Sequence, residues 1–138
     1  MNTLEEIFAR SNLQADYFRR YCDYVQQLIS EIDIESVKRV VVCLLEAREN
    51  NKTIYFAGNG GSAATASHFS QDMAEIGRKI NGKGFRTSSI NDNVSALTAI
   101  SNDYSYEHVF SLQIQHNFDP GDVLVVISAS GNSPNVIK

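Results

Sequence analysis

Apolar residues recur every three or four positions through the first 50 residues, which is the spacing of one helix face. Tyr17, Tyr21 and Leu28 follow this spacing, which breaks near Asp33 before a second predicted helix over residues 35–49. Two helices ahead of the first strand present a large apolar surface. We expect part of that surface to pack against a second subunit.

Short apolar runs at residues 52–57 and 123–127 predict buried strands, and residues 85–90 predict another strand between them. Because helical patterns separate them, the strands require right-handed crossovers and form a parallel, doubly wound sheet. The helices are predicted over residues 62–76, 93–100 and 105–117, with a loop at 77–84 and a turn at 101–104.

The last residues predict a helix start, with Ser133 as its cap and Pro134 as its first residue. The sequence stops at Lys138, about one turn later. A three-stranded parallel sheet that ended there would leave an edge and a core face uncovered. We therefore expect an N-terminal portion of a longer chain, or else a short domain completed by an oligomer partner.

Composition narrows the class of protein. A length of 138 residues favours one domain, with a helical oligomerisation segment over residues 1–50 and an α/β part over 51–138. The net charge of −4 and the pI of about 5.3 disfavour nucleic acid, and no apolar run approaches a membrane span. The first residues do not resemble a signal peptide, and Cys22 and Cys43 are predicted to be reduced, packed thiols. A cytoplasmic protein is expected.

Two glycine- and serine-rich loops each follow a predicted strand and lead into a helix. The first is residues 58–62, Gly-Asn-Gly-Gly-Ser, and the second is residues 128–134, Ser-Ala-Ser-Gly-Asn-Ser-Pro. Small residues let the backbone approach a ligand, hydroxyls donate hydrogen bonds, and a helix start favours negative charge. Two such loops at the carboxyl edge of one sheet predict a small phosphorylated ligand.

A dinucleotide is the first alternative, because Gly58-x-Gly60-x-x-Ala63 formally fits that fingerprint. The fingerprint also requires an acid about 20 residues further on, and Asp92 lies much further away. A nucleotide-dependent oxidoreductase is therefore disfavoured. A tight turn without a ligand also remains open.

Residues 58–69, 101–104 and 121–138, taken in order, resemble the sugar isomerase (SIS) domain family, and most closely its phosphoheptose isomerases. The resemblance implies an αβα sandwich, a homotetramer with active sites between subunits, and a phosphorylated sugar as ligand. The implied reaction converts sedoheptulose 7-phosphate to D-glycero-D-manno-heptose 7-phosphate for surface polysaccharide biosynthesis.

The resemblance also implies site residues. The substrate-binding candidates are Asn59, Gly60, Gly61, Ser62, Asn102, Asp103, Ser128, Ala129, Ser130 and Ser133. The family usually has Thr where this chain has Ala129, so one hydroxyl is lost from the phosphate loop. Asp103 is also a candidate for catalysis.

His68 and Asp72 lie four residues apart on a predicted helix and so share a face. An aldose–ketose isomerisation moves a proton between adjacent carbons, which requires a base. The resemblance implies one zinc ion per subunit, with a ligand at the His68 position and a Glu that serves as ligand and base at the Asp72 position. It implies that the remaining ligands, a Gln and a His, lie outside this chain. Here the acid is one methylene shorter, and zinc normally takes three or four protein ligands. Gln71 and Glu75 are possible substitutes, whereas His108 and His116 are expected on the helix surface.

Two readings of the function remain open. The first is a phosphosugar isomerase with Asp72 as its base. The second is a non-catalytic SIS-domain protein that senses sugar phosphates or binds a replication initiator, which the change from Glu to Asp favours.

Overall fold

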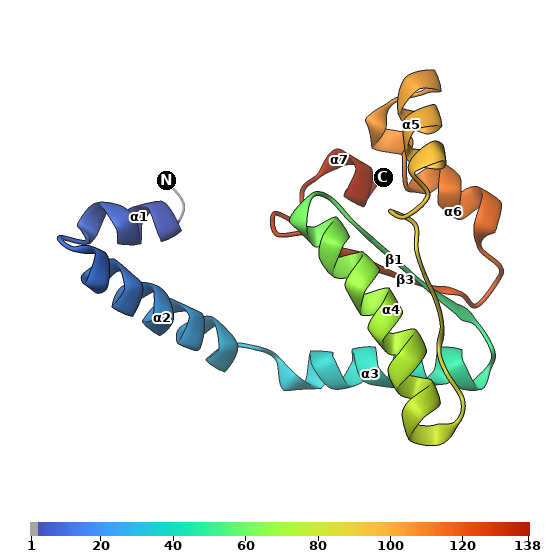
Figure 1. The fold of residues 1–138 in the computed structure, drawn as a ribbon, viewed down its shortest axis with the longest axis horizontal. Helices are drawn as coiled ribbons and strands as arrows, with labels where there is room; N and C mark the ends of the chain where they lie inside the picture. The colour runs from blue at the N-terminus through green and yellow to red at the C-terminus, as the bar shows by residue number, and fades with distance from the viewer. Residues whose placement is uncertain (1–2) are drawn as a thin grey trace. The chain divides into compact units, whose positions relative to one another are not determined.

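The computed structural model describes residues 3–138, in two compact units that divide between Arg39 and Val40. Its described elements run in this order (Figure 1): α1 (Thr3–Arg10), α2 (Gln14–Ser30), α3 (Ile34–Glu49), β1 (Thr53–Gly58), α4 (Gly61–Asn81), β2 (Arg86–Ser89), α5 (Val94–Asp103), the 3₁₀ helix η1 (Tyr106–His108), α6 (Ser111–Asn117), β3 (Val123–Ile127) and α7 (Pro134–Ile137). Helices alternate with strands from β1 onward, as the sequence predicts.

The first unit contains a helix break that the apolar spacing does not reveal. α1 and α2 are separate helices, and Phe8 packs edge-on against Tyr17 with ring centroids 5.6 Å apart. The Ser11 hydroxyl donates to the Ile7 carbonyl at 2.7 Å and so satisfies an acceptor at the end of α1. Spacing of apolar residues on both sides of a short turn resembles one continuous helix, so it does not locate this break.

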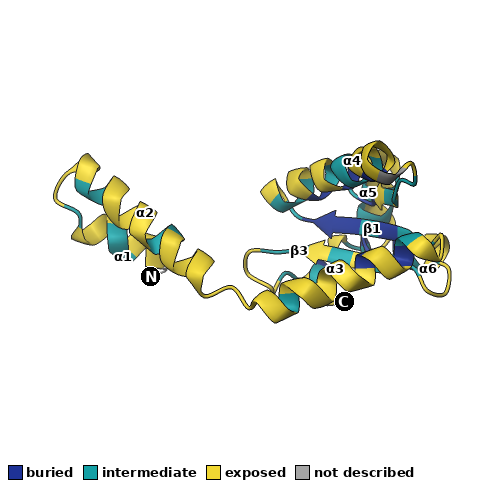
Figure 2. Ribbon diagram, turned by 90° about the horizontal axis from the view of Figure 1, so that it is seen from below, coloured by how far each residue is buried: buried dark blue, intermediate teal, exposed yellow. Residues whose placement is uncertain are grey.

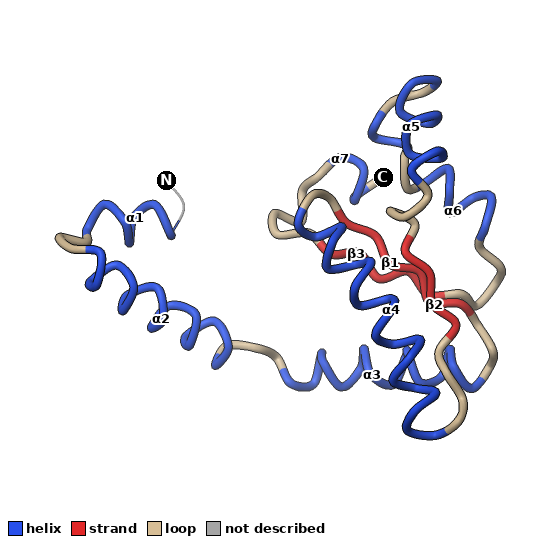
Figure 3. The backbone as a smooth tube through the Cα atoms, in the orientation of Figure 1, coloured by secondary structure: helices blue, strands red, loops and turns tan. Residues whose placement is uncertain are grey.

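The second unit is built on a parallel sheet in the order β2-β1-β3 (Figure 3). β1 is the central strand, and both of its neighbours are reached through helical crossovers. This arrangement confirms the predicted α/β class and the parallel, doubly wound sheet.

An apolar core covers each face of the central strand, and Figure 2 shows β1 as mostly buried. On one face, Ile54 and Phe56 pack with side chains of α3 and α4, and both are fully buried. On the other face, Ala57 packs with Val109 and Phe110, and α5 and α6 add partly buried side chains. Alternate residues of β1 therefore enter different cores, which explains its continuous apolar run.

The predicted loop over residues 77–84 is mostly helix, because α4 continues to Asn81. Gly77 is buried, and a Cβ there would lie 2.9 Å from the Phe85 ring. Gly77 therefore permits close packing of α4 against the start of β2 and is not a turn former. Gly82, with φ of 72°, supplies the left-handed residue that ends the helix.

The segment before β3 also differs from its prediction. The predicted turn at residues 101–104 is the last turn of α5, which the Tyr104 N–H closes on the Ile100 carbonyl at 3.0 Å. The single helix predicted over 105–117 is divided into η1 and α6. Ser105 is extended, and its hydroxyl lies 2.9 Å from His108 Nδ1, which favours a separate turn.

A carboxylate joins the start of β1 to the turn before β3. Asp122 accepts hydrogen bonds from the N–H of Thr53 at 2.8 Å and of Asp119 at 3.0 Å. Burial raises the pKa of Asp122, but these hydrogen bonds, with the positive charges of Lys52 and Arg86, outweigh it and hold the pKa below its usual value.

Two further expectations concern surface properties. Cys22 and Cys43 are free thiols within the described chain, but both are exposed, so the prediction that they are packed is wrong. Their helices place both residues on faces that other described residues do not cover. Among residues 3–138, the structure contains no helix long and apolar enough to cross a membrane.

Candidate functional site

The two glycine- and serine-rich loops lie side by side at the carboxyl edge of the sheet. Gly58, the last residue of β1, pairs in register with Ile127, the last residue of β3. The loop of residues 58–62 and the loop of residues 128–133, called here the serine loop, therefore begin at neighbouring strand ends. Ligands of open parallel sheets bind at this edge.

The first loop makes a sharp turn that requires glycine at two positions. At Gly58 there is no space for a side chain, and at Gly60 the backbone conformation is unfavourable for any other residue. A Cβ on Gly58 would lie 2.7 Å from the backbone C and O of Ser62 and 2.9 Å from the Ile127 carbonyl. Gly60 has φ of 54° and ψ of −120°, a conformation reserved for glycine. α4 starts at the next residue, Gly61, and Ser62 N–H donates to the Asn59 carbonyl at 2.9 Å.

Asn91, which follows β2, fixes the backbone of the first loop. Its side-chain amide donates to the Gly58 carbonyl at 2.8 Å, and its Oδ1 accepts from the Gly58 N–H at 3.0 Å. One residue earlier, the Ile90 N–H donates to the Phe56 carbonyl at 3.0 Å. The Asn91 side chain therefore continues the strand ladder and holds Gly58 in place.

Asn59 is fixed by Asn135 and Tyr106, neither of which is among the predicted site residues. Its Nδ2 donates to Asn135 Oδ1 at 2.8 Å, and its Oδ1 accepts from Asn135 Nδ2 at 2.9 Å. The Tyr106 hydroxyl donates to the same Asn59 Oδ1 at 3.0 Å. Asn135 belongs to the serine-rich motif that carries the family resemblance, whereas no local pattern identifies Tyr106 or Asn91. Only the crossovers bring these side chains together.

The serine loop is held by its own hydroxyls. Ser128 Oγ accepts from the Gly131 N–H at 3.1 Å, and Ser130 Oγ accepts from the Asn132 N–H at 3.2 Å. Gly131 has φ of 64°, so the loop reverses at a residue that tolerates this conformation. Each accepting hydroxyl keeps its own hydrogen free to donate to an anion.

The two remaining candidates in the serine loop are Ala129 and Ser133, and they differ in the hydrogen-bonding groups that they provide. Ala129 is exposed and contributes no hydroxyl. Ser133 occupies the residue before α7, and Pro134 is the first helical residue as predicted. Within the described part of the chain, however, the Ser133 side chain caps no backbone N–H, so the expected capping bond is absent.

Asn102 and Asp103 occupy the exposed end of α5. The Asn102 side-chain amide donates to Asp103 Oδ1 at 2.8 Å. The structure packs α5 against η1, and η1 carries the Tyr106 that bonds Asn59. The second predicted substrate segment is thus connected to the first loop through η1, and the structure records no direct bond between the two.

His68 and Asp72 face one another on α4. His68 Nε2 lies 3.5 Å from Asp72 Oδ2, and the two side chains are 79% and 49% exposed. Within residues 3–138 no group of three or more His, Cys, Asp or Glu side chains is placed to hold a metal ion. Two donors are fewer than zinc normally takes, so these residues by themselves do not complete a zinc site. The zinc assignment stays a prediction.

The possible substitutes on α4 have other surroundings. Glu75 pairs with Lys79 at 2.5 Å, and this hydrogen bond together with the lysine charge lowers the pKa of Glu75. Gln71 lines a shallow surface depression of about 350 Å³ with these two residues. His116 is exposed on α6, while His108 is half-buried in η1. The structure brings none of these histidines to the two loops.

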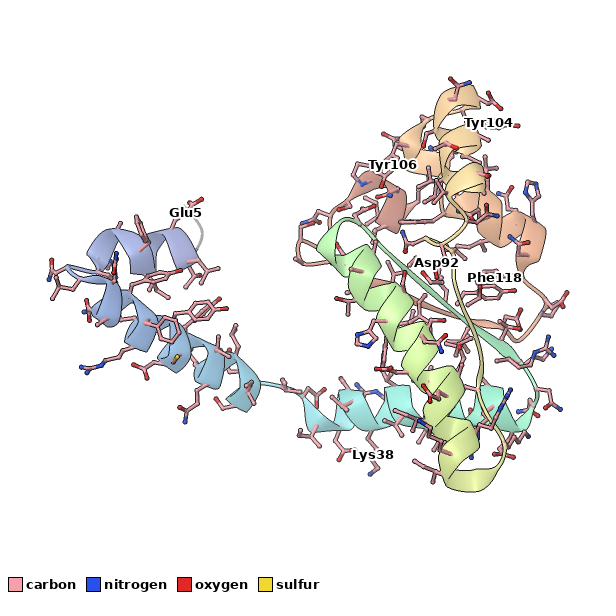
Figure 4. All side chains as sticks on the ribbon, in the orientation of Figure 1. Glu5, Lys38, Asp92, Tyr104, Tyr106 and Phe118 are labelled. Carbon is pink, nitrogen blue, oxygen red and sulfur yellow. The ribbon has the colours of Figure 1, made fainter. Side chains whose placement is uncertain are left out.

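Binding of a nucleotide ribose would require an acidic side chain near the first loop, and Asp92 is the nearest candidate in the sequence. In the structure the Asp92 carboxylate instead accepts a hydrogen bond from another side chain. The Ser67 hydroxyl on α4 donates to Asp92 Oδ1 at 2.5 Å, and Asp92 is labelled in Figure 4. Asp92 therefore joins α4 to the segment after β2.

The parallel sheet and its paired loops define an α/β protein whose candidate ligand site lies at the carboxyl edge of the sheet. The family model described as the SIS domain matches residues 17–138, and the chain belongs to the SIS domain family.

Relatives and solved structures agree with this assignment. The chain is 48% identical over 105 residues to the phosphoheptose isomerase of Helicobacter pylori strain 26695, covering 75% of this chain and 54% of the relative. It is 37% identical over 134 residues to the phosphoheptose isomerase of Geobacter sp. strain M21, and the match covers 96% of this chain and 65% of the relative. The chain spans about half to two thirds of the length of these curated relatives.

Two solved structures share the fold. Phosphoheptose isomerase GmhA from Neisseria gonorrhoeae superposes with a TM-score of 0.78 at 38% identity, covering 91% of this chain and 66% of that one. A phosphoheptose isomerase from Francisella tularensis superposes with a TM-score of 0.77 at 22% identity, and the match covers 99% of this chain and 67% of that one. The second likeness supports the fold alone.

Proposed function

We propose that this protein is a phosphosugar aldose–ketose isomerase that converts sedoheptulose 7-phosphate to D-glycero-D-manno-heptose 7-phosphate. The observation that carries the proposal is the register pair Gly58–Ile127, which sets the serine loop beside the first loop. The relatives that match the chain are named phosphoheptose isomerases, which supports this substrate. Supply of a heptose for surface polysaccharide is the corresponding biological role.

The serine loop is the proposed phosphate site. Ser128 and Ser130 keep donor hydrogens after accepting from the loop backbone. Asn59 and the Asn102–Asp103 pair, on two other segments, are proposed to hold the hydroxyl groups of the open-chain sugar. The phosphate would then be bound at one end of the ligand and the reacting carbons towards the other.

Asp72 is the proposed base. Its carboxylate takes a proton from C1 of the ketose, leaving an enediol, and returns a proton to C2, while a hydroxyl proton moves from O1 to O2. The Asn102 amide is proposed to stabilise charge on the oxygens, and the Asp103 carboxylate is proposed to carry the hydroxyl proton from O1 to O2. His68, 3.5 Å from Asp72, orients the carboxylate. No step is assigned to zinc, since the described residues supply two donors.

The test is a coupled assay of sedoheptulose 7-phosphate turnover. Loss of a positioned base costs about 10²–10⁴-fold in rate, so we expect Asp72→Asn to lower kcat by that range. Asp72→Glu, which restores the acid usual in the family, is expected to match or exceed the wild type. Glu75→Gln is the matched control, because Glu75 lies on the same helix and is paired to Lys79.

Ligand binding measured by calorimetry on the same variants separates the two functions that remain open. Binding without turnover by the wild type would contradict the isomerase and support the non-catalytic phosphosugar-binding protein. Equal turnover by Asp72→Asn and the wild type would exclude Asp72 as the base.

We also propose that the protein is a homotetramer in the cytoplasm. Support comes from α3, on which Val41 and Leu45, four residues apart on one helix face, are both exposed. Contiguous exposed apolar side chains mark interaction surfaces. The free thiols Cys22 and Cys43 fit a reducing compartment.

Sedimentation equilibrium tests the assembly. We expect a mass about four times that of the 15.3 kDa chain, and a shift to smaller species in Val41→Glu, because a charge on the apolar surface opposes its burial. Val94→Glu, at an exposed valine of α5, is the control and keeps the wild-type mass. A monomeric wild type would contradict the tetramer.

A further inference from the structure

Asn59 is held on both sides of its carboxamide. Asn135, which is 4% exposed, exchanges two hydrogen bonds with it, and the Tyr106 hydroxyl adds a third. The three side chains come from the first loop, from α7 and from η1. Figure 4 shows Tyr106 in this part of the molecule, and η1 packs against α7.

Counting donors and acceptors shows what Asn59 retains. A carboxamide oxygen has two lone pairs and its nitrogen carries two hydrogens. Asn135 and Tyr106 use both lone pairs of Asn59 Oδ1, and Asn135 Oδ1 uses one hydrogen of Asn59 Nδ2. One N–H is left, so Asn59 is fixed as a donor towards an oxygen of a ligand.

The network also sets the spacing between the two loops. Asn135 follows the serine loop by two residues, and Gly58, next to Asn59, is clamped by Asn91. Asn59 is therefore held relative to the strand ends on one side and to the serine loop on the other. A ligand that contacts both loops meets a fixed separation.

We propose that Asn135 and Tyr106 are positioning residues, which hold the Asn59 carboxamide as a donor to a sugar oxygen while the serine loop binds the phosphate. The proposal rests on the proposed function, because it takes the ligand to be a sugar phosphate. It predicts that the network acts on the sugar part of the ligand and leaves the phosphate part unaffected.

Tyr106→Phe tests the proposal, since it removes a hydroxyl and keeps the ring. We expect the affinity for sedoheptulose 7-phosphate to fall about 3- to 10-fold, the size of one hydrogen bond, while the affinity for inorganic phosphate stays within about twofold. Asn135→Ala is expected to lower the sugar phosphate affinity further. The matched control is Tyr104→Phe, at a neighbouring tyrosine that is 69% exposed and outside the network. Calorimetry measures both ligands.

Side-chain amide resonances of Asn59 supply a readout that needs no ligand. In Tyr106→Phe these hydrogens should exchange with solvent faster than in Tyr104→Phe. Three results for Tyr106→Phe would each overturn the proposal. These are an equal loss of affinity for both ligands, an unchanged affinity for sedoheptulose 7-phosphate, and an unchanged exchange rate of the Asn59 amide hydrogens. A wild type that binds inorganic phosphate but not sedoheptulose 7-phosphate would contradict the proposed function, and the amide exchange then decides the positioning.

Discussion

Gly58→Ala is expected to destabilise the protein by about 3 kcal/mol, as overpacking at a site that cannot relax does. The new Cβ would lie 2.7 Å from the backbone of Ser62 and 2.9 Å from the Ile127 carbonyl. All three clashing atoms are backbone atoms, so no side chain can rotate away. Relief requires β1 to separate from β3 or α4 to move, and either change also disturbs the ligand loops. Urea unfolding followed by circular dichroism measures the effect.

Two neighbouring glycines provide the controls. Gly61→Ala, at the start of α4, places its Cβ more than 4 Å from every described atom outside its chain neighbours and the adjoining helix backbone. We therefore expect stability within about 0.5 kcal/mol of the wild type or slightly above it. Gly60→Ala also meets no described atom, but its φ of 54° adds strain of about 1–3 kcal/mol. Equal stability of Gly58→Ala and Gly61→Ala would contradict the close packing of β1 against β3 and α4 at Gly58.

The second large effect is expected for the double variant Ser128→Ala/Ser130→Ala. A hydrogen bond to a charged group contributes about 1.5–3 kcal/mol, so loss of two predicts at least a roughly 100-fold weaker binding of sedoheptulose 7-phosphate. The same hydroxyls accept from the N–H groups of Gly131 and Asn132, so their removal also loosens the loop. Both consequences lower affinity. Calorimetry with inorganic phosphate should show a similar loss, because the serine loop is the proposed phosphate site.

Ser30→Ala is the control, since this exposed serine of α2 donates to the Gln27 carbonyl and lies in the other compact unit. Its affinity should equal that of the wild type. Retention of phosphate binding by the double variant would place the phosphate elsewhere on the molecule.

Much of the site was predictable because it is local in sequence. Both loops follow apolar strands directly, so their position at the carboxyl edge follows from a parallel sheet. His68 and Asp72 share a face because the helix period brings residues four apart together, and the structure places them 3.5 Å apart. These inferences require only the geometry of one strand or one helix.

The errors concern residues whose local propensity is overruled by packing. Glycines 77 and 82 resemble a loop, but the first lets α4 approach Phe85 and only the second ends the helix. Ser101 and Asn102 resemble a turn, yet the Ser101 hydroxyl bonds the Leu97 carbonyl within α5 at 2.6 Å. Glycine and small polar residues suit both loops and helix interiors, so the neighbouring segment decides between the two.

By itself the sequence determined the alternation of strands and helices from β1 onward, the two glycine- and serine-rich loops at one sheet edge and the family, because each depends on periodicity or on a contiguous motif. Only the tertiary structure decided how the loops are held. Asn59, Asn91, Tyr106 and Asn135 lie up to 76 residues apart, and their hydrogen bonds form once the crossovers bring the strand ends together. A polar side chain carries no signal of its distant partner, so this network becomes visible only in the folded chain.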